Sequence, residues 1–387
     1  MAMLYVLKIY ASKNWAINIY LKSLNNFFQN INKSNEPEKP SKKKPIFPIN
    51  AQLRNYLVRY GREVKLPVSY SDLQRYTYSV PLKNKQGKDT SWEKLSFDMK
   101  EWEYLRKSLV QIYAILKTEG DVSYIDHLDV SRIDFCIFGN SQPFRIRIIN
   151  KLNDNYDHYY IKQADASRIY GLELEHLLSP NRITYFTHNA TLIEEHIPGI
   201  PGDIFITDHL HDPNINNIRL AKEFVKFNER CFVQLLGDMR SYNYVVNIIP
   251  DIEDFQYRIR AIDFDQQSYE GRKSLYLPQF YKENIAFVEM VINNLDTKSI
   301  AQYQAEERTM MTFRLVLAKY QVKELFDIMS KDKISQPEKI EQLKKELTAH
   351  FKEPSTYNKA RTMGDVVKRH LKQTLQKNLL LVPKPKH

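Results

Sequence analysis

Two carboxylates and one amide are spaced as phosphoryl-transfer chemistry requires. Asp238 and Asn243 lie five residues apart in the stretch Gly-Asp-Met-Arg-Ser-Tyr-Asn, and Asp263 follows a β-rich run from Tyr257 to Ile262. Transfer of a phosphoryl group from a nucleotide needs a carboxylate that orients the accepting hydroxyl and oxygen ligands that hold Mg²⁺ on the phosphates. Asp238 is therefore the candidate base, and Asn243 and Asp263 are the candidate metal ligands.

A β-hairpin is expected to position these three side chains. The run from Tyr244 to Ile248 is apolar and β-branched, which indicates a strand, and Arg258 to Ile262 can pair with it. Asn243 then stands at the entry of the hairpin and Asp263 at its exit, so two oxygen ligands meet at one end. Two protein ligands suffice, because Mg²⁺ completes its shell with phosphate and water.

This pattern resembles the catalytic and metal-binding loops of the protein-kinase-like superfamily. Asp-x-x-x-x-Asn, a strand pair and an Asp-Phe-Gly-type turn are typical of that superfamily, and the forms Gly237-Asp238 and Ile262 to Asp265 are closest to its aminoglycoside and choline kinase branch. The resemblance implies that Arg240 is a catalytic cation beside the transferring phosphate. The Asp-x-x-x-x-Asn spacing alone also fits a solvated turn.

Two positions depart from the family pattern. Leu236 stands where the family usually has His, and this weakens the expected support of the loop. Asp265 stands where protein kinases have Gly, which adds an acid near the metal ligands.

Composition and charge restrict the class of protein. The 387 residues carry a formal net charge of +11, and the two cysteines, Cys136 and Cys231, are too far apart in sequence to suggest a disulfide framework. No run approaches the roughly 18 to 20 apolar residues of a membrane span. Residues 1–28 lack the apolar core and cleavage site of a signal peptide. We expect a cytoplasmic protein.

The predicted fold class is α+β, a bilobal protein-kinase-like fold with a small antiparallel β lobe, a helical large lobe and helical extensions at both ends. In the region before the β lobe, Trp92, Leu95, Trp102, Leu105 and Leu109 recur at helical spacing. The predicted parts are an amphipathic segment and basic linker (1–48), a helical accessory region (49–124), the N-lobe (125–196), the C-lobe (197–330) and a basic helical extension (331–387).

Short strands are predicted from residue 125 onward, over Arg132–Phe138, Phe144–Ile149 and His158–Lys162, before a helix from Asp165 to Leu178. In the superfamily, a lysine at the end of the third strand binds the α and β phosphates and is held by a glutamate of the next helix. Lys162 is therefore the candidate nucleotide-binding lysine. Glu173 is its expected partner, with Glu175 as the rival.

Two loops complete the predicted nucleotide site. The turn between the first two strands has one glycine, whereas phosphate loops rely on missing side chains to bring backbone N–H groups to the phosphates. Asn140 and Ser141 are the candidates to supply polar side chains instead. After strands over 182–186 and 191–195, a His-Ile-Pro-Gly turn resembles the segment that joins the lobes in the aminoglycoside kinase branch. Glu194 and His196 would contact adenine there through their main chain.

The rest of the chain is expected to be largely helical. Asn214 or Asn217 caps a helix that leads to the Gly237 loop, and further helices are expected over 280–295, 300–329 and 337–351. The stretch 208–212, Asp-His-Leu-His-Asp, has metal-binding residue types, but no other residues complete a zinc site, so we interpret it as a polar loop.

The sequence therefore predicts an ATP- and Mg²⁺-dependent phosphotransferase whose acceptor is an unidentified hydroxyl, of a small molecule or sugar rather than a protein. Two other classes remain open. The one-glycine turn and Leu236 also fit a pseudokinase or nucleotide-sensing scaffold without turnover. Basic runs at 42–44 and 359–386 fit a protein that binds nucleic acid or an anionic surface, although no groove-reading motif accompanies them.

Overall fold

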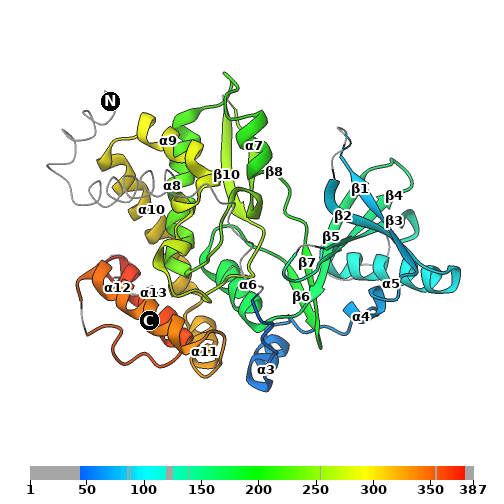
Figure 1. Ribbon diagram of the computed structural model, residues 1–387, viewed down its shortest axis with the longest axis horizontal. Helices are drawn as coiled ribbons and strands as arrows, with labels where there is room; N and C mark the ends of the chain where they lie inside the picture. Colours follow the sequence, from blue (N-terminus) through cyan, green and yellow to red (C-terminus); the bar gives the residue numbers. More distant parts are fainter. Residues whose placement is uncertain are drawn as a thin grey trace.

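The computed structural model describes residues 44–379 except 85–86, 88, 119–124, 138, 253 and 354. The predicted segment 1–28 and most of the linker after it lie outside these described residues. The described chain is α+β, with a seven-stranded antiparallel sheet, a three-stranded sheet and eleven helices, α3 to α13. Figure 1 shows the large sheet on one side of the molecule and most of the long helices on the other.

The large sheet has the strand order β1-β2-β3-β4-β5-β7-β6, and each neighbouring pair is antiparallel. The predicted strands in this sheet are confirmed within a few residues. Its strands are β1 (Tyr78–Lys83), β2 (Asp89–Ser96), β3 (Leu128–Cys136), β4 (Phe144–Asn150), β5 (Tyr156–Gln163), β6 (Tyr185–His188) and β7 (Thr191–Glu195).

The two faces of this sheet differ in chemistry, because side chains alternate along each strand. On β4, Phe144, Ile146 and Ile148 are buried and belong to one hydrophobic cluster with α5 (Met99–Thr118). Arg145 and Arg147 alternate with them and lie on the opposite face. Helix α5 therefore covers the apolar face and leaves the polar face to the rest of the molecule.

The prediction that residues 49–124 are a helical accessory region is wrong in part. The region contains α3 (Ala51–Arg59), α4 (Tyr70–Leu73) and α5, but also the β1–β2 hairpin, and β2 pairs with β3. Trp92 and Leu95 lie in β2 and not in a helix. The helix begins only at Met99, where the Asp98 side chain accepts the backbone N–H of Glu101.

Helix α6 (Ala166–Leu178) lies between the large sheet and the long helices (Figure 1). Asp165 is its N-cap and accepts the backbone N–H of Ser167, as expected for an Asp in this position. Apart from His176, every residue of the helix is buried. A charged side chain on this helix must therefore find its partners inside the protein.

The smaller sheet contains the predicted hairpin. Its order is β10-β9-β8, with β8 (Ile200–Pro201), β9 (Tyr244–Pro250) and β10 (Phe255–Ala261). Ala261 pairs with Tyr244, so the entry and exit of the hairpin adjoin. The hairpin prediction is confirmed. The preceding helices are α7 (Gly202–Asp208) and α8 (Asn217–Gln234), and α8 is capped by Asn216 and not by Asn214 or Asn217.

The C-terminal part is helical, as predicted. The expected helix over 300–329 is divided at Ala318, and the helices are α9 (Ile285–Asn294), α10 (Thr297–Leu317), α11 (Lys319–Met329), α12 (Pro337–Phe351) and α13 (Met363–Leu379). Two of the basic residues on α13 bond to the body, Lys368 to Asp327 and Arg369 to the carbonyl of Thr356. Among the described helices, none is both long and apolar enough to cross a membrane.

Candidate functional site

The three groups predicted to do chemistry lie at one end of the β9–β10 hairpin. The backbone N–H of Ile262 donates to the backbone carbonyl of Asn243 (3.0 Å). This bond places the next residue, Asp263, beside Asn243. The Asn243 side chain in turn donates to the backbone carbonyl of Asp238 (2.7 Å). The structure thus brings Asp238, Asn243 and Asp263 together.

Asp238 has a strained backbone that several contacts hold in place. Its φ is 57°, in the left-handed region that non-glycine residues seldom adopt. Its backbone N–H lies 2.9 Å from the Tyr281 hydroxyl and 3.1 Å from the carbonyl of Leu275. Strain of this kind persists where the surroundings enforce it, often at functional sites. The preceding Leu236 is buried and bridges to Gln267 through its backbone, so backbone pairing supports the loop here.

Arg240 lies against the Asp238 carboxylate. Its Nε donates to Asp238 Oδ1 (2.9 Å), and its Nη1 donates to Glu283 (3.2 Å). Burial raises the pKa of Asp238 to about 6, and the charges of Asp263 and Glu283 add to this rise while Arg240 opposes it. A carboxylate that titrates near neutral pH has the affinity for protons that a general base needs.

A buried arginine that the sequence analysis did not single out lies at the centre of the site. Arg168, on α6, is 1% exposed. Its guanidinium donates to Asp265 (Nε, 2.7 Å), Glu194 (Nη1, 2.9 Å) and Asp263 (Nη2, 2.7 Å). The feature of the sequence that points to Arg168 is a charged residue in the first turn of a helix that is apolar on most sides.

The predicted partner of Lys162 is wrong. Lys162 Nζ donates to Glu194 Oε2 (2.5 Å), which lies on the neighbouring strand β7 and not on α6. Glu173 is fully buried elsewhere, where it accepts bonds from Tyr56 (2.6 Å), Tyr185 (2.6 Å) and Arg62 (3.0 Å).

Helix geometry explains why Glu173 does not face Lys162. Position 173 is five residues beyond 168, which corresponds to about 140° around the helix, so the two side chains leave α6 on different sides. The rival, Glu175, accepts a bond from Gln234 on α8 (3.0 Å) and is likewise engaged away from Lys162. The acid that neutralises Lys162 comes from the sheet itself.

The two predicted adenine contacts have different outcomes. Glu194 pairs with Tyr160 of β5 on one side and with Tyr185 of β6 on the other, so its backbone is part of the sheet and the predicted main-chain contact is wrong for this residue. Its side chain instead joins Lys162 to Arg168. His196 follows the end of β7, with Nδ1 3.3 Å from the Tyr160 hydroxyl, and its predicted contact stays a prediction.

The turn between β3 and β4 lies next to the charged cluster. The backbone N–H of Gln142 donates to the carbonyl of Gly139 (3.0 Å), which closes the turn. Ser141 Oγ lies 3.5 Å from Arg168 Nη2, and the half-buried Asn140 precedes it. The turn therefore lies beside Arg168, and the predicted contact of Asn140 and Ser141 with phosphate stays a prediction.

The donor set at Asp263 fits a hard cation. Within the described part of the chain, no group of three or more His, Cys, Asp or Glu side chains could hold a metal ion, and this includes the described stretch 208–212. A metal here would rely on one carboxylate, Asp263, and one amide, Asn243, with phosphate and water as the remaining ligands. Mg²⁺ accepts such a sparse set of protein oxygens, whereas zinc sites use three or four protein ligands.

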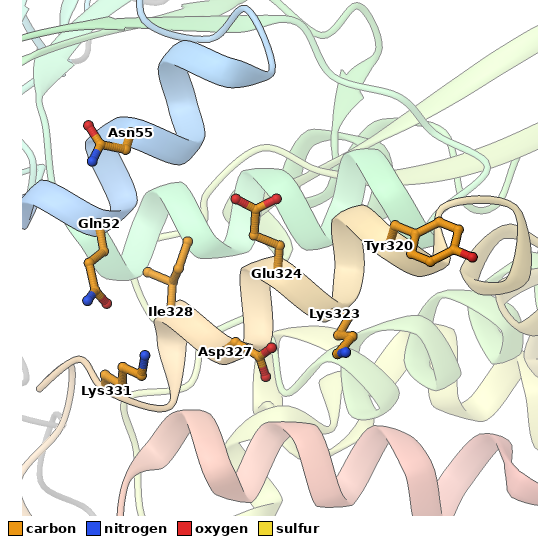
Figure 2. Close-up of a pocket in the computed structure, with 8 residues that line it drawn as sticks. All are labelled: Gln52, Asn55, Tyr320, Lys323, Glu324, Asp327, Ile328 and Lys331. Atoms are coloured by element: carbon orange, nitrogen blue, oxygen red, sulfur yellow. The ribbon is translucent and has the colours of Figure 1, made fainter.

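An open groove of about 440 Å³ lies away from these residues, between α3 and α11 (Figure 2). Figure 2 shows mostly polar side chains along it, with Lys323 and Glu324 on α11 and Gln52 on α3. It is lined by Gln52, Asn55, Tyr320, Lys323, Glu324, Asp327, Ile328 and Lys331. None of these belongs to the predicted site, so the groove adds nothing to the chemistry proposed below.

Comparison with known proteins finds no family model that matches this chain and no curated protein that matches it.

Proposed function

We propose that this protein is an ATP- and Mg²⁺-dependent phosphotransferase with a protein-kinase-like fold. The observation that carries the proposal is the convergence of Asp238, Asn243 and Asp263 at one end of the β9–β10 hairpin, with Arg168 linking Asp263 to the Glu194–Lys162 pair. The order of elements supports it. From β3 onward the chain forms three strands, a helix, two strands, the short β8 and α7, a long helix, a loop and a hairpin, which is the succession that the resemblance to the kinase-like superfamily implies apart from β8 and α7.

Each residue has a proposed part in the reaction. Lys162 contacts the nucleotide phosphates, and the turn at Ser141 lies over them. Asn243 and Asp263 would hold Mg²⁺, which would neutralise charge on the nucleotide phosphates. Asp238 orients the acceptor hydroxyl and accepts its proton, and a pKa of about 6 leaves this carboxylate mostly ionised at pH 7.

Arg240 contributes a positive charge at the same place. It bonds to Asp238 and Glu283, so it is held close to the point at which the phosphoryl group would be transferred. A fixed cation there offsets charge that develops in the transition state. The acceptor class, a hydroxyl of a small molecule or sugar, rests on the resemblance alone.

One observation favours a second candidate, a nucleotide-sensing scaffold without turnover. Tyr160 precedes Lys162 by two residues on β5 and pairs in register with Arg145 on β4, so all three lie on one face of the sheet. Arg145 stacks on the Trp92 ring, 4.3 Å from its centroid. Aromatic rings and a guanidinium can stack on a base, so this face supports nucleotide binding by itself and does not require turnover.

Calorimetric titration with ATP, with and without Mg²⁺, tests the proposal on the wild type and on Asp263→Asn. We expect binding that depends on Mg²⁺ and is lost in the variant. Asp251→Asn is the matched control, because Asp251 is an exposed acid near the turn at the opposite end of the same hairpin. An ATP affinity that is the same with and without Mg²⁺, and the same in the wild type and in Asp263→Asn, would favour the scaffold. The absence of any nucleotide binding would overturn the proposal.

Turnover separates the two candidates. If the protein transfers phosphate, Asp238→Asn should lower kcat by a factor of about 10² to 10⁴ while nucleotide affinity is retained. Acceptors can be screened by release of ADP from ATP. An Asp238→Asn protein with wild-type turnover would exclude Asp238 as the base.

A further inference from the structure

One guanidinium group connects four parts of the fold at the proposed site. Arg168 leaves the first turn of the buried helix α6 and bonds to Glu194 on β7, to Asp263 and Asp265 after β10, and approaches Ser141 in the β3–β4 turn. The planar fork of an arginine can serve several oxygens in fixed directions, which a lysine cannot do.

The contacts on Asp263 are unequal. Oδ1 accepts two bonds, from Arg168 Nη2 (2.7 Å) and from the backbone N–H of Asp265 (2.9 Å). The Asp263 side chain is nonetheless 32% exposed, whereas that of Arg168 is 1% exposed. Oδ1 is thus held on the protein side, and Oδ2 is the oxygen that remains for a cation in the site.

The charges in the cluster show why this arrangement needs Arg168. Two cations, Lys162 and Arg168, face three acids, Glu194, Asp263 and Asp265. Burial and the neighbouring Asp265 raise the pKa of Asp263. Burial also acts against ionisation of Asp265, but Arg168, Lys44 and Lys162 hold the pKa of that carboxyl below its ordinary value. Loss of the guanidinium would therefore leave Glu194, Asp263 and Asp265 without the cation that bonds to all three.

Packing fixes the helix that carries Arg168 against the segment that carries the two acids. Ser167 Oγ donates to the carbonyl of Gln267 (2.7 Å). A Cβ on Gly171, one turn further along α6, would lie 3.0 Å from Cβ of the same glutamine, so only a glycine allows this approach without displacement. The guanidinium is therefore delivered to Asp263 from a rigid support.

We propose that Arg168 is the positioning residue of the metal site. It holds Asp263 through Oδ1 so that Oδ2 faces the cation, and through Glu194 it couples this carboxylate to Lys162. Asp265 is the counter-ion that keeps Arg168 in this position. Arg168, through Glu194, thus connects α6 to Lys162 on β5. This is the connection that Glu173 was expected to make. The inference rests on the proposed function, because it assigns a role within that same site.

The test measures metal affinity and not activity. Mn²⁺ replaces Mg²⁺ as a spectroscopic probe, and paramagnetic resonance of free Mn²⁺ reports binding to the protein with a non-hydrolysable ATP analogue. In Arg168→Lys the charge remains but the fork is lost, so Mn²⁺ affinity should fall about 10- to 100-fold, as for other residues that orient metal ligands. Affinity for the nucleotide without metal should change much less.

A matched control separates this effect from a general loss of stability. Arg230, on α8, is also buried and bonds to two acids outside the proposed site, Glu223 (2.8 Å) and Glu307 (3.1 Å), and to the carbonyl of Ile259 on β10 (2.8 Å). Arg230→Lys should disturb the fold to a similar extent and leave Mn²⁺ affinity unchanged. An equal loss of affinity in both variants, or wild-type affinity in Arg168→Lys, overturns the inference.

A charge-balanced double variant tests the same inference if Arg168→Lys does not fold. Arg168→Met combined with Asp265→Asn removes one charge of each sign, so the net charge of the buried cluster is unchanged. Its reference is Asp265→Asn alone. The double variant should bind Mn²⁺ about 10-fold more weakly than this reference, and equal affinities would refute the role of Arg168. If the wild type binds neither metal nor nucleotide, it is the proposed function that fails.

Discussion

Replacement of Asp238 by asparagine should make the protein more stable at neutral pH. Burial raises the pKa of this carboxyl from 3.8 to about 6. The folded state therefore holds a proton on Asp238 more firmly than the unfolded state does. Between about pH 4 and pH 6 the folded protein binds more protons, so its free energy of unfolding falls as the pH rises through this window. Above it, the ionised carboxylate destabilises the fold.

The magnitude follows from the shift. A rise of about two pKa units corresponds to about 3 kcal/mol at full effect. The Asp238 side chain is 36% exposed, and solvent screens its interactions. We therefore expect Asp238→Asn to gain about 1 kcal/mol in unfolding free energy at pH 7.5 relative to the wild type. The gain should vanish at about pH 4, where Asp238 is protonated in the folded state.

Urea unfolding, followed by tryptophan fluorescence from pH 4 to pH 8, measures this difference. A control of opposite sign is Asp157→Asn. Burial opposes ionisation there too, but the His158 N–H (2.7 Å) and Lys117 (3.1 Å) hold the pKa of Asp157 below its ordinary value. That variant should be less stable than the wild type at neutral pH. A destabilised Asp238→Asn protein at pH 7.5, or a difference independent of pH, would refute the reasoning.

Three other outcomes are expected. Glu173→Gln should lower the free energy of unfolding by about 3 kcal/mol, since it removes the charge that two tyrosine hydroxyls and an arginine bond to. Calorimetry should find the nucleotide affinity unchanged, whereas a lower affinity would indicate that Glu173 is the partner of Lys162. Gly171→Ala should lower the free energy of unfolding by about 1 to 2 kcal/mol, although alanine has the higher helix propensity, because the added Cβ would press on Gln267. The melting temperature should fall accordingly, and a raised melting temperature would contradict that packing. The acid limb of the kcat/KM profile should lie near pH 6 and move to higher pH in Arg240→Gln, since Arg240 lowers the pKa of Asp238; an unmoved limb would show that another group titrates.

Local patterns predicted the hairpin and the meeting of three polar residues at one end of it. The apolar run after Asn243 and the β-rich run before Asp263 form β9 and β10, and their register places these two residues together. Asp165 caps α6 because its carboxylate accepts a backbone N–H two residues on. In each case the contact joins residues that are close in sequence, or the two strands of one hairpin.

The errors arose where partners are distant in sequence. Trp92 and Leu95 fit a helical period, but β2 gains hydrogen bonds by pairing with β3 some forty residues later, and this long-range pairing decides the local structure. Similarly, the resemblance suggested a helix glutamate for Lys162. The sheet register instead placed Glu194, thirty-two residues away, on the same face.

By itself, the sequence determined the α+β class, the order of most strands and helices, and the three polar groups that adjoin at the hairpin, because these depend on periodicity and short-range pairing. The tertiary structure alone decided the electrostatics of the site. Arg168 meets Glu194, Asp263 and Asp265 across separations of 26, 95 and 97 residues. A buried charge is stable only where its partners converge, and the packing of α6 on the segment after β10 brings them there.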